Sequence, residues 1–123
     1  MKLLTSRGLR SWQNMIDKGA TMAMEAWDDS LKPNQDWNHA WGAAPAGLIP
    51  RMIGGITPSA PGFAQFNFDP HPGDLEYFTL KHPTPFGAIT VDYRNGGFVL
   101  EIPSGTCGIY RGEKLGAGKH ILK

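Results

Sequence analysis

Apolar and polar residues alternate through the second half of the chain, and this pattern restricts that half to short β-strands. Asn95-Gly96 separates two of the alternating runs, and this dipeptide is a strong signal for a two-residue hairpin turn. Residues 106–110 and 119–122 supply the last strands, joined across 112–118. The apolar members of the runs are Ala64, Phe66, Phe68, Phe78, Leu80, Ile89, Val91, Tyr93, Phe98, Leu100 and Ile102. Short antiparallel strands at this spacing predict a small β-sandwich.

The first third of the chain carries helical signals instead. Apolar residues recur at three- and four-residue spacing from Leu9 to Ile16, Ser11 can cap the start, and Gly19 can close the end in a left-handed conformation. A second helix is expected over 37–53, capped by Asp36.

Two prolines interrupt this second helix. Pro45 and Pro50 each remove a backbone donor and crowd the preceding turn, so the helix should kink or break near Ala44. Gly54-Gly55 ends it, and residues 56–62 form a linker rich in proline and glycine.

These patterns predict an α+β fold that is mainly β. A short N-terminal arm of two helices over 1–56 precedes a small antiparallel β-sandwich over 57–123. The 16 glycines and 10 prolines among 123 residues agree with this, because they favour turns and short strands over long helices. The length leaves room for about one ordinary domain.

Charge and composition exclude several kinds of partner. The net charge is +1, with 12 basic and 11 acidic residues interspersed, so no basic stripe is present to bind nucleic acid. No stretch is long enough to span a membrane. The apolar start at Met1 ends at Thr5, too soon for a signal peptide, and the compartment stays undetermined.

No metal or other cofactor is expected. Cys107 is the only cysteine, which excludes an internal disulfide and a cysteine-based zinc site. His71, His82 and His120 show neither the spacing of metal ligands nor a serine or cysteine partner.

Residues 19–41 concentrate the groups that could do chemistry. Glu25 stands between Met24 and Ala26-Trp27, and apolar or aromatic surroundings tend to raise the pKa of a carboxylate towards the range useful for acid–base catalysis. Taken alone, the residues are explained more simply by an exposed acidic loop in which Asp28, Asp29 and Asp36 are ordinary loop residues. His39 is likewise a possible structural histidine bonded to a loop carbonyl.

The order of residues in this stretch resembles a known family. Residues 19–28 read Gly-Ala-Thr-Met-Ala-Met-Glu-Ala-Trp-Asp, and residues 37–43 read Trp-Asn-His-Ala-Trp-Gly-Ala. They resemble the Gly-Ala-Thr-Thr-x-x-Glu-x-Trp-Asp and Asn-His-x-x-x-Gly segments of the α-L-rhamnosidases, glycoside hydrolases similar to family 78. The similarity continues through residues 50–56, 61–63 and 70–73.

The resemblance implies the last helices of an (α/α)6 toroid followed by a C-terminal β-sandwich, and inverting hydrolysis of rhamnose-containing glycosides. It implies that Glu25 is the general base and that His39 lines the sugar pocket, with Trp27 and Trp37 as further sugar contacts. Inversion also needs a general acid, which in this family lies earlier in the toroid, in sequence that these 123 residues do not contain.

Two functions follow as hypotheses. The first is the C-terminal part of an inverting α-L-rhamnosidase that carries the general-base half of the site and is inactive alone. The alternative is a non-catalytic β-sandwich module for carbohydrate binding or assembly. Apolar residues of the arm, such as Trp12 and Trp41, would pack in the family against helices absent here. A homo-oligomer formed through the arm, or association with the missing part of the toroid, is therefore expected.

Overall fold

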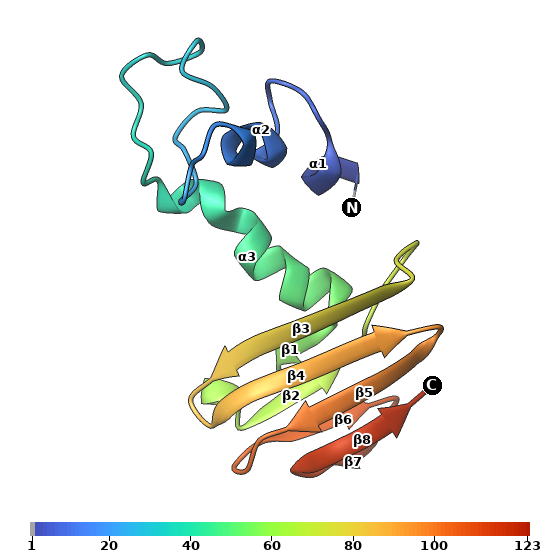
Figure 1. The fold of residues 1–123 in the computed structure, drawn as a ribbon. Helices are drawn as coiled ribbons and strands as arrows, with labels where there is room; N and C mark the ends of the chain where they lie inside the picture. The colour runs from blue at the N-terminus through green and yellow to red at the C-terminus, as the bar shows by residue number, and fades with distance from the viewer. Residues whose placement is uncertain (1) are drawn as a thin grey trace. The chain divides into compact units, whose positions relative to one another are not determined.

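The computed structural model describes residues 2–123 and contains two compact units, one ending at Gly47 and the other comprising Leu48–Lys123. Figure 1 colours the chain by residue number from the helical beginning to the strands of the second unit. Strands account for more of the described residues than helices do, so the predicted α+β, mainly β class is confirmed. Met1, where the predicted arm begins, lies outside the described residues.

The first unit contains α1 (Lys2–Thr5) and α2 (Trp12–Asp17). The side chain of Ser11 caps α2 by accepting a hydrogen bond from the backbone N–H of Asn14 at 3.1 Å. At the other end, Gly19 has φ +83°. The N–H groups of Gly19 and Ala20 donate to the carbonyls of Ile16 and Met15 at 2.9 and 3.0 Å, which is a Schellman closure. Both predicted ends of this helix are confirmed.

The predicted second helix is helical through Ile53, but its start was wrong. A 3₁₀ turn, η1 (Ala40–Ala43), is followed by α3 (Ala44–Leu48) and a π-helical turn, η2 (Ile49–Ile53). The helix does not begin at residue 37 because His39 is extended, with φ −112° and ψ 98°, and its N–H donates to the carbonyl of Ala23 at 2.8 Å. His39, not Asp36, is the cap residue, and its side chain makes no capping bond.

Near Ala44, where a kink or break was expected, the 3₁₀ turn η1 passes into α3, and a second change in helix type follows at Ile49. Pro50 cannot donate a backbone hydrogen bond, and it lies in the π-helical turn. There the N–H of Gly54 donates to the carbonyl of Ile49, five residues back, at 3.1 Å.

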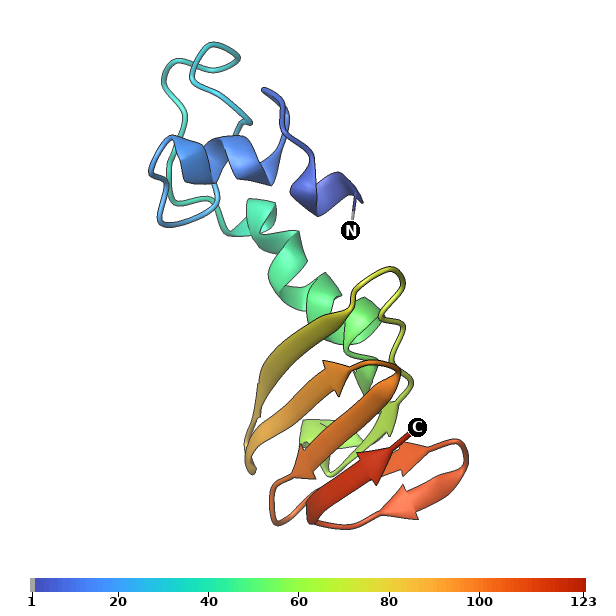
Figure 2. The ribbon, with the colours of Figure 1, turned by 45° about the vertical axis from the view of Figure 1, so that its right-hand side comes forward.

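Two four-stranded sheets make up most of the second unit. One has the order β1 (Ile56–Pro58), β2 (Gln65–Phe68), β6 (Cys107–Tyr110), β7 (Glu113–Leu115). The other has the order β3 (Tyr77–Thr84), β4 (Gly87–Arg94), β5 (Gly97–Ile102), β8 (Gly118–Leu122). A 3₁₀ turn, η3 (Pro61–Phe63), lies between β1 and β2. Within this unit, Figures 1 and 2 show one sheet lying over the other.

Three details of these sheets differ from the prediction. Strand β1 lies inside the expected linker, where it pairs with β2. Strand β7 lies inside the expected connection over 112–118, where it pairs with β6. The pair β2–β6 is parallel, whereas the other strand pairs among the described residues are antiparallel.

The predicted hairpin is confirmed between β4 and β5. Asn95 and Gly96 have φ of +50° and +81°, as a type I′ turn requires, and Arg94 pairs with Gly97 across it.

Side chains from both sheets form one core in the second unit. Its buried members are Ile56, Phe66, Phe68, Ile89, Val91, Phe98, Leu100 and Ile102. The rings of Phe68 and Phe98 meet edge to face with centroids 5.8 Å apart, joining a strand of each sheet. The alternating residues therefore face the core as predicted, except Ala64, which is exposed.

Candidate functional site

The candidate site residues lie in the loop between α2 and η1, which we call the site loop (residues 20–39; Figure 1). The segments 23–29 and 35–39, here the near limb and the far limb, are joined by hydrogen bonds. The N–H of Glu25 donates to the carbonyl of Asp36 at 2.9 Å, and the N–H of His39 donates to the carbonyl of Ala23 at 2.8 Å. This pairing holds Glu25 and His39 on adjacent limbs of one loop.

The carboxylate of Glu25 lies at the surface among polar partners. Its Oε1 forms an ion pair with Nζ of Lys32, and its Oε2 accepts a hydrogen bond from the N–H of Asp36 at 3.3 Å. The Lys32 hydrogen bond lowers the pKa of Glu25 most, followed by the bond from Asp36, with a further contribution from the charge of His39. Met24, the preceding residue, is buried instead. The expected rise in the pKa of Glu25 is therefore wrong, because its apolar neighbours in sequence do not surround the carboxylate.

The two tryptophans proposed as sugar contacts have different surroundings. Trp27 packs edge to face against Trp12 with ring centroids 4.9 Å apart, and its carbonyl accepts from Nδ2 of Asn14 at 2.9 Å. Trp37 is exposed, and its Nε1–H donates to Oδ1 of Asp29 at 3.1 Å. Trp27 thus contributes to packing of the first unit, whereas Trp37 lies at its surface.

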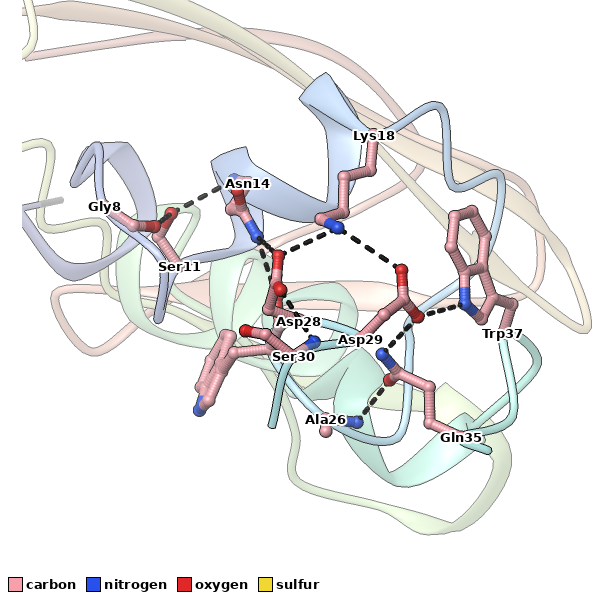
Figure 3. Close-up of polar contacts among 11 residues, drawn as sticks. Gly8, Ser11, Asn14, Lys18, Ala26, Asp28, Asp29, Ser30, Gln35 and Trp37 are labelled. Carbon is pink, nitrogen blue, oxygen red and sulfur yellow. Dashed lines mark hydrogen bonds and ion pairs between the residues drawn. The ribbon is translucent and has the colours of Figure 1, made fainter. Parts of the chain in front are cut away.

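Asp28 is not the ordinary loop residue that the sequence suggested. Its side chain is buried, and its Oδ1 accepts from the N–H of Ser30 at 2.9 Å. Its Oδ2 lies 2.9 Å from Nζ of Lys18 and accepts from Nδ2 of Asn14 at 3.2 Å (Figure 3). The bonds from Ser30, Lys18 and Asn14 hold the pKa of Asp28 far below its usual range. The Asp-x-Ser turn pattern was the available signal for this role.

Asp29 is bonded to three side chains. It accepts from Nε2 of Gln35 and Nε1 of Trp37, and its other oxygen lies 3.3 Å from Nζ of Lys18. These bonds lower the pKa of Asp29, with that from Gln35 contributing most. The side chain of Lys18 thus bridges two ionised carboxylates, and its own pKa is raised, most strongly by the bond to Asp28.

Among residues 2–123, no three His, Cys, Asp or Glu side chains are grouped so that they could hold a metal ion. In the same range, no helix has the length and apolar character needed to cross a membrane.

His82 is partly buried beside Phe63, with ring centroids 5.0 Å apart, and burial lowers its pKa.

Two family models match consecutive parts of the chain. Residues 1–53 match the bacterial alpha-L-rhamnosidase 6 hairpin glycosidase domain, and residues 55–107 match the bacterial alpha-L-rhamnosidase C-terminal domain. This chain belongs to the α-L-rhamnosidase family. The resemblance inferred from residues 19–43 is therefore confirmed.

Solved α-L-rhamnosidases share the fold. The native enzyme from Aspergillus terreus is 25% identical, with a TM-score of 0.80 over 97% of this chain and 16% of its own. The Streptomyces avermitilis enzyme complexed with L-rhamnose is 24% identical, with a TM-score of 0.77 over 98% of this chain and 15% of its own. The enzyme from Dictyoglumus thermophilum is 20% identical, with a TM-score of 0.78 over 99% of this chain and 18% of its own. This chain therefore spans about a sixth of the length of these relatives, and no curated protein matches it in sequence.

Proposed function

We propose that this chain supplies the general-base part of the active site of an inverting α-L-rhamnosidase. In this proposal Glu25 deprotonates the attacking water, and His39 and Trp37 contact the sugar. Trp27 either packs beneath these residues or contacts the sugar as well. The substrates are rhamnose-containing glycosides, the class named by the matched family. The observation that carries the proposal is the hydrogen-bonded pairing of the two limbs, which holds Glu25 next to the far limb that bears His39.

The ionisation of Glu25 suits this role. Its lowered pKa keeps the carboxylate charged near neutral pH, and a charged carboxylate can take a proton from water. Lys32 occupies one carboxylate oxygen, so water must reach the other or displace the lysine. The lowered pKa also makes the Glu25 carboxylate a weaker base.

We place the general acid outside these residues. An inverting enzyme places its acid about 6.5–9.5 Å from the base, and the acid must be protonated when the reaction begins. Asp28 and Asp29 follow Glu25 closely, but their hydrogen-bond donors keep both ionised, so neither suits the role. We assign residues 1–56 to a six-hairpin catalytic domain that supplies this acid and residues 57–123 to the C-terminal β-sandwich.

The partner in this proposal is the remainder of the six-hairpin domain. Large apolar side chains in the matched segment are exposed, with Trp41 at 89% and Ile16 at 64%. Covering one such side chain is worth roughly 1.5–3 kcal/mol. A second copy of this chain paired through the same arm is the competing occupant. A dimer mass in light scattering that does not change when the remainder of the domain is added would favour that occupant.

Reconstitution tests the function. The chain alone is expected to show no measurable hydrolysis of an aryl α-L-rhamnoside, because a general acid typically contributes 10²- to 10⁴-fold. Mixed with the preceding part of a related enzyme that lacks its own matching segment, it should gain activity. Glu25→Gln should abolish that activity, whereas Glu113→Gln, on the exposed β7, should not.

A further variant tests the role of Glu25 as a base. Azide should partly restore the rate of Glu25→Ala and give a product of inverted configuration, since a small anion can replace the activated water. A full rate in Glu25→Gln would refute the assignment. Turnover by the isolated chain, abolished by Glu25→Gln, would show instead that the chain is a complete enzyme.

The alternative function is a carbohydrate-binding module without catalysis. An open groove of about 380 Å³ in the second unit, lined by Phe68, Tyr110 and Arg111 among others, favours it. The Arg111 guanidinium lies 4.9 Å from the centre of the Tyr110 ring. Rhamnose-dependent NMR shifts confined to this groove, with no activity on reconstitution, would support the module.

A further inference from the structure

One carboxylate, that of Asp29, ties the two limbs of the site loop to α2 (Figure 3). Its Oδ1 accepts two hydrogen bonds from the far limb, from Nε2 of Gln35 at 2.9 Å and from Nε1 of Trp37 at 3.1 Å. Its Oδ2 lies 3.3 Å from Nζ of Lys18, at the C-terminal end of α2. Three segments of the first unit therefore meet at a single side chain.

Both far-limb partners lie next to a contact with Glu25. The Oε1 of Gln35 accepts a hydrogen bond at 2.8 Å from the N–H of Ala26, the residue that follows Glu25. Trp37 follows Asp36. The N–H of Asp36 donates to Oε2 of Glu25 at 3.3 Å, and the carbonyl of Asp36 accepts from the backbone N–H of Glu25 at 2.9 Å. One short path thus runs through the side chain of Gln35 to the backbone beside Glu25, and the other runs through the backbone of Asp36 to the Glu25 carboxylate.

Catalytic geometry depends on such connections. A base and a sugar-contacting ring must stay within about 0.5 Å of their productive positions. Trp37 is 43% exposed, so packing alone does not fix its ring. A hydrogen bond to a charged acceptor is stronger than one between neutral groups. The bond from the indole to Asp29 is therefore well placed to set the orientation of the ring.

We propose that Asp29 is a positioning residue that holds the Glu25 carboxylate and the Trp37 indole in one fixed arrangement. The roles of Glu25 and Trp37 towards the sugar rest on the proposed function, whereas the positioning rests on the contacts just described. Asp28 is the natural comparison, because it is also ionised and bonded to Lys18 but contacts Ser30 and Asn14 rather than the far limb.

NMR of the full 123-residue chain tests the link to Trp37. In Asp29→Ala, solvent exchange of the Trp37 Nε1–H should be about tenfold faster, the effect of losing a charge-assisted bond worth roughly 1.4 kcal/mol. The Trp12 Nε1–H, which donates to the carbonyl of Gly42 at 2.9 Å, serves as the internal reference. Asp28→Asn should leave the ratio of the two exchange rates unchanged.

The link to Glu25 is tested by its carboxyl titration. Removing the charge of Asp29 lowers the pKa of Glu25, so Asp29→Ala is compared with the equally neutral Asp29→Asn, which keeps an acceptor oxygen. The pKa of Glu25 should be about 0.5 higher in Asp29→Ala, because the hydrogen bond from Asp36 is weakened. Lys32 and His39 also act on this titration but are the same in both variants.

Two results would overturn the proposal. One is a Trp37 Nε1–H exchange rate that is the same in Asp29→Ala as in wild type. The other is a Glu25 pKa that is the same in Asp29→Ala as in Asp29→Asn. If Asp29→Ala does not fold, Trp37→Phe replaces it, since it removes the indole donor and keeps an aromatic ring. The pKa of Glu25 should then rise relative to wild type, and an unchanged value would be equally decisive.

Reconstituted activity separates this proposal from the function on which it rests. If the wild-type chain restores rhamnosidase activity, Asp29→Ala should raise KM about tenfold and Asp29→Asn should recover part of that loss. If the wild-type chain restores none, the proposed function fails, and the two NMR measurements still decide the positioning role.

Discussion

Three carboxylates in the first unit, those of Glu25, Asp28 and Asp29, have lowered pKa values because hydrogen-bond donors surround them. Such donors favour the charged form and outweigh the opposing effect of burial. At this scale, charged hydrogen bonds contribute to holding the site loop in place.

These carboxylates predict that the first unit loses stability in acid. The folded form binds fewer protons than the unfolded form, so the stabilisation is present above the ordinary aspartate pKa of 3.8 and is lost as the pH falls through the folded values. Tryptophan fluorescence should therefore report opening of the site loop below about pH 4. Asp28→Asn should flatten this pH dependence, whereas Asp17→Asn, on the exposed face of α2, should preserve it. A fluorescence signal that is constant down to pH 2 would contradict the prediction.

At the scale of elements, the start of β1 depends on a close backbone contact. Gly55 has φ +67°, and its carbonyl accepts from the N–H of Asp69 at 2.9 Å. A Cβ at Gly55 would lie 2.1 Å from the carbonyl carbon of Asp69. Only glycine allows the chain to enter the sheet at this point.

Gly55→Ala is therefore expected to cost about 2–5 kcal/mol, the sum of left-handed strain and overpacking. Gly96 provides the matched control, since it has φ +81° but nothing within 4 Å of an added Cβ. Gly96→Ala should cost only the strain, about 1–2 kcal/mol. Denaturant unfolding followed by tyrosine absorbance measures both, and equal costs would mean that the contact with Asp69 contributes nothing.

At the scale of the whole molecule, aromatic residues separate the two units spectroscopically. All four tryptophans, at positions 12, 27, 37 and 41, lie in the first unit. All three tyrosines, at positions 77, 93 and 110, lie in the second. Each unit can therefore be followed separately in the intact chain.

Phe66→Ala should destabilise the second unit alone. Phe66 is fully buried in the sandwich core, and truncating such a side chain costs about 3–5 kcal/mol. The unfolding midpoint from tyrosine absorbance should fall, while that from tryptophan fluorescence stays constant. Val99→Ala, at a half-buried position of β5, should shift the tyrosine midpoint less. Equal shifts in both signals after Phe66→Ala would show that the units unfold together.

The sequence determined the features that depend on neighbouring residues. Ser11 and Gly19 set the ends of α2 through backbone bonds that reach only a few residues. Asn95-Gly96 set the hairpin, and the alternation of apolar residues set which side chains enter the core. The motif of residues 19–43 set the family. These signals act over a few residues or are carried by the order of residues itself.

Only the tertiary structure decided the surroundings of the site. Lys18 and Asp28 are ten positions apart, and nothing local to either residue indicates their ion pair. The partner of Glu25 is Lys32, which the turn of the loop brings back to it, so its pKa falls where its apolar neighbours suggested a rise. The parallel pair β2–β6 likewise joins segments about forty residues apart. Electrostatic surroundings and strand partners depend on which distant segments meet, and a single sequence does not display those meetings.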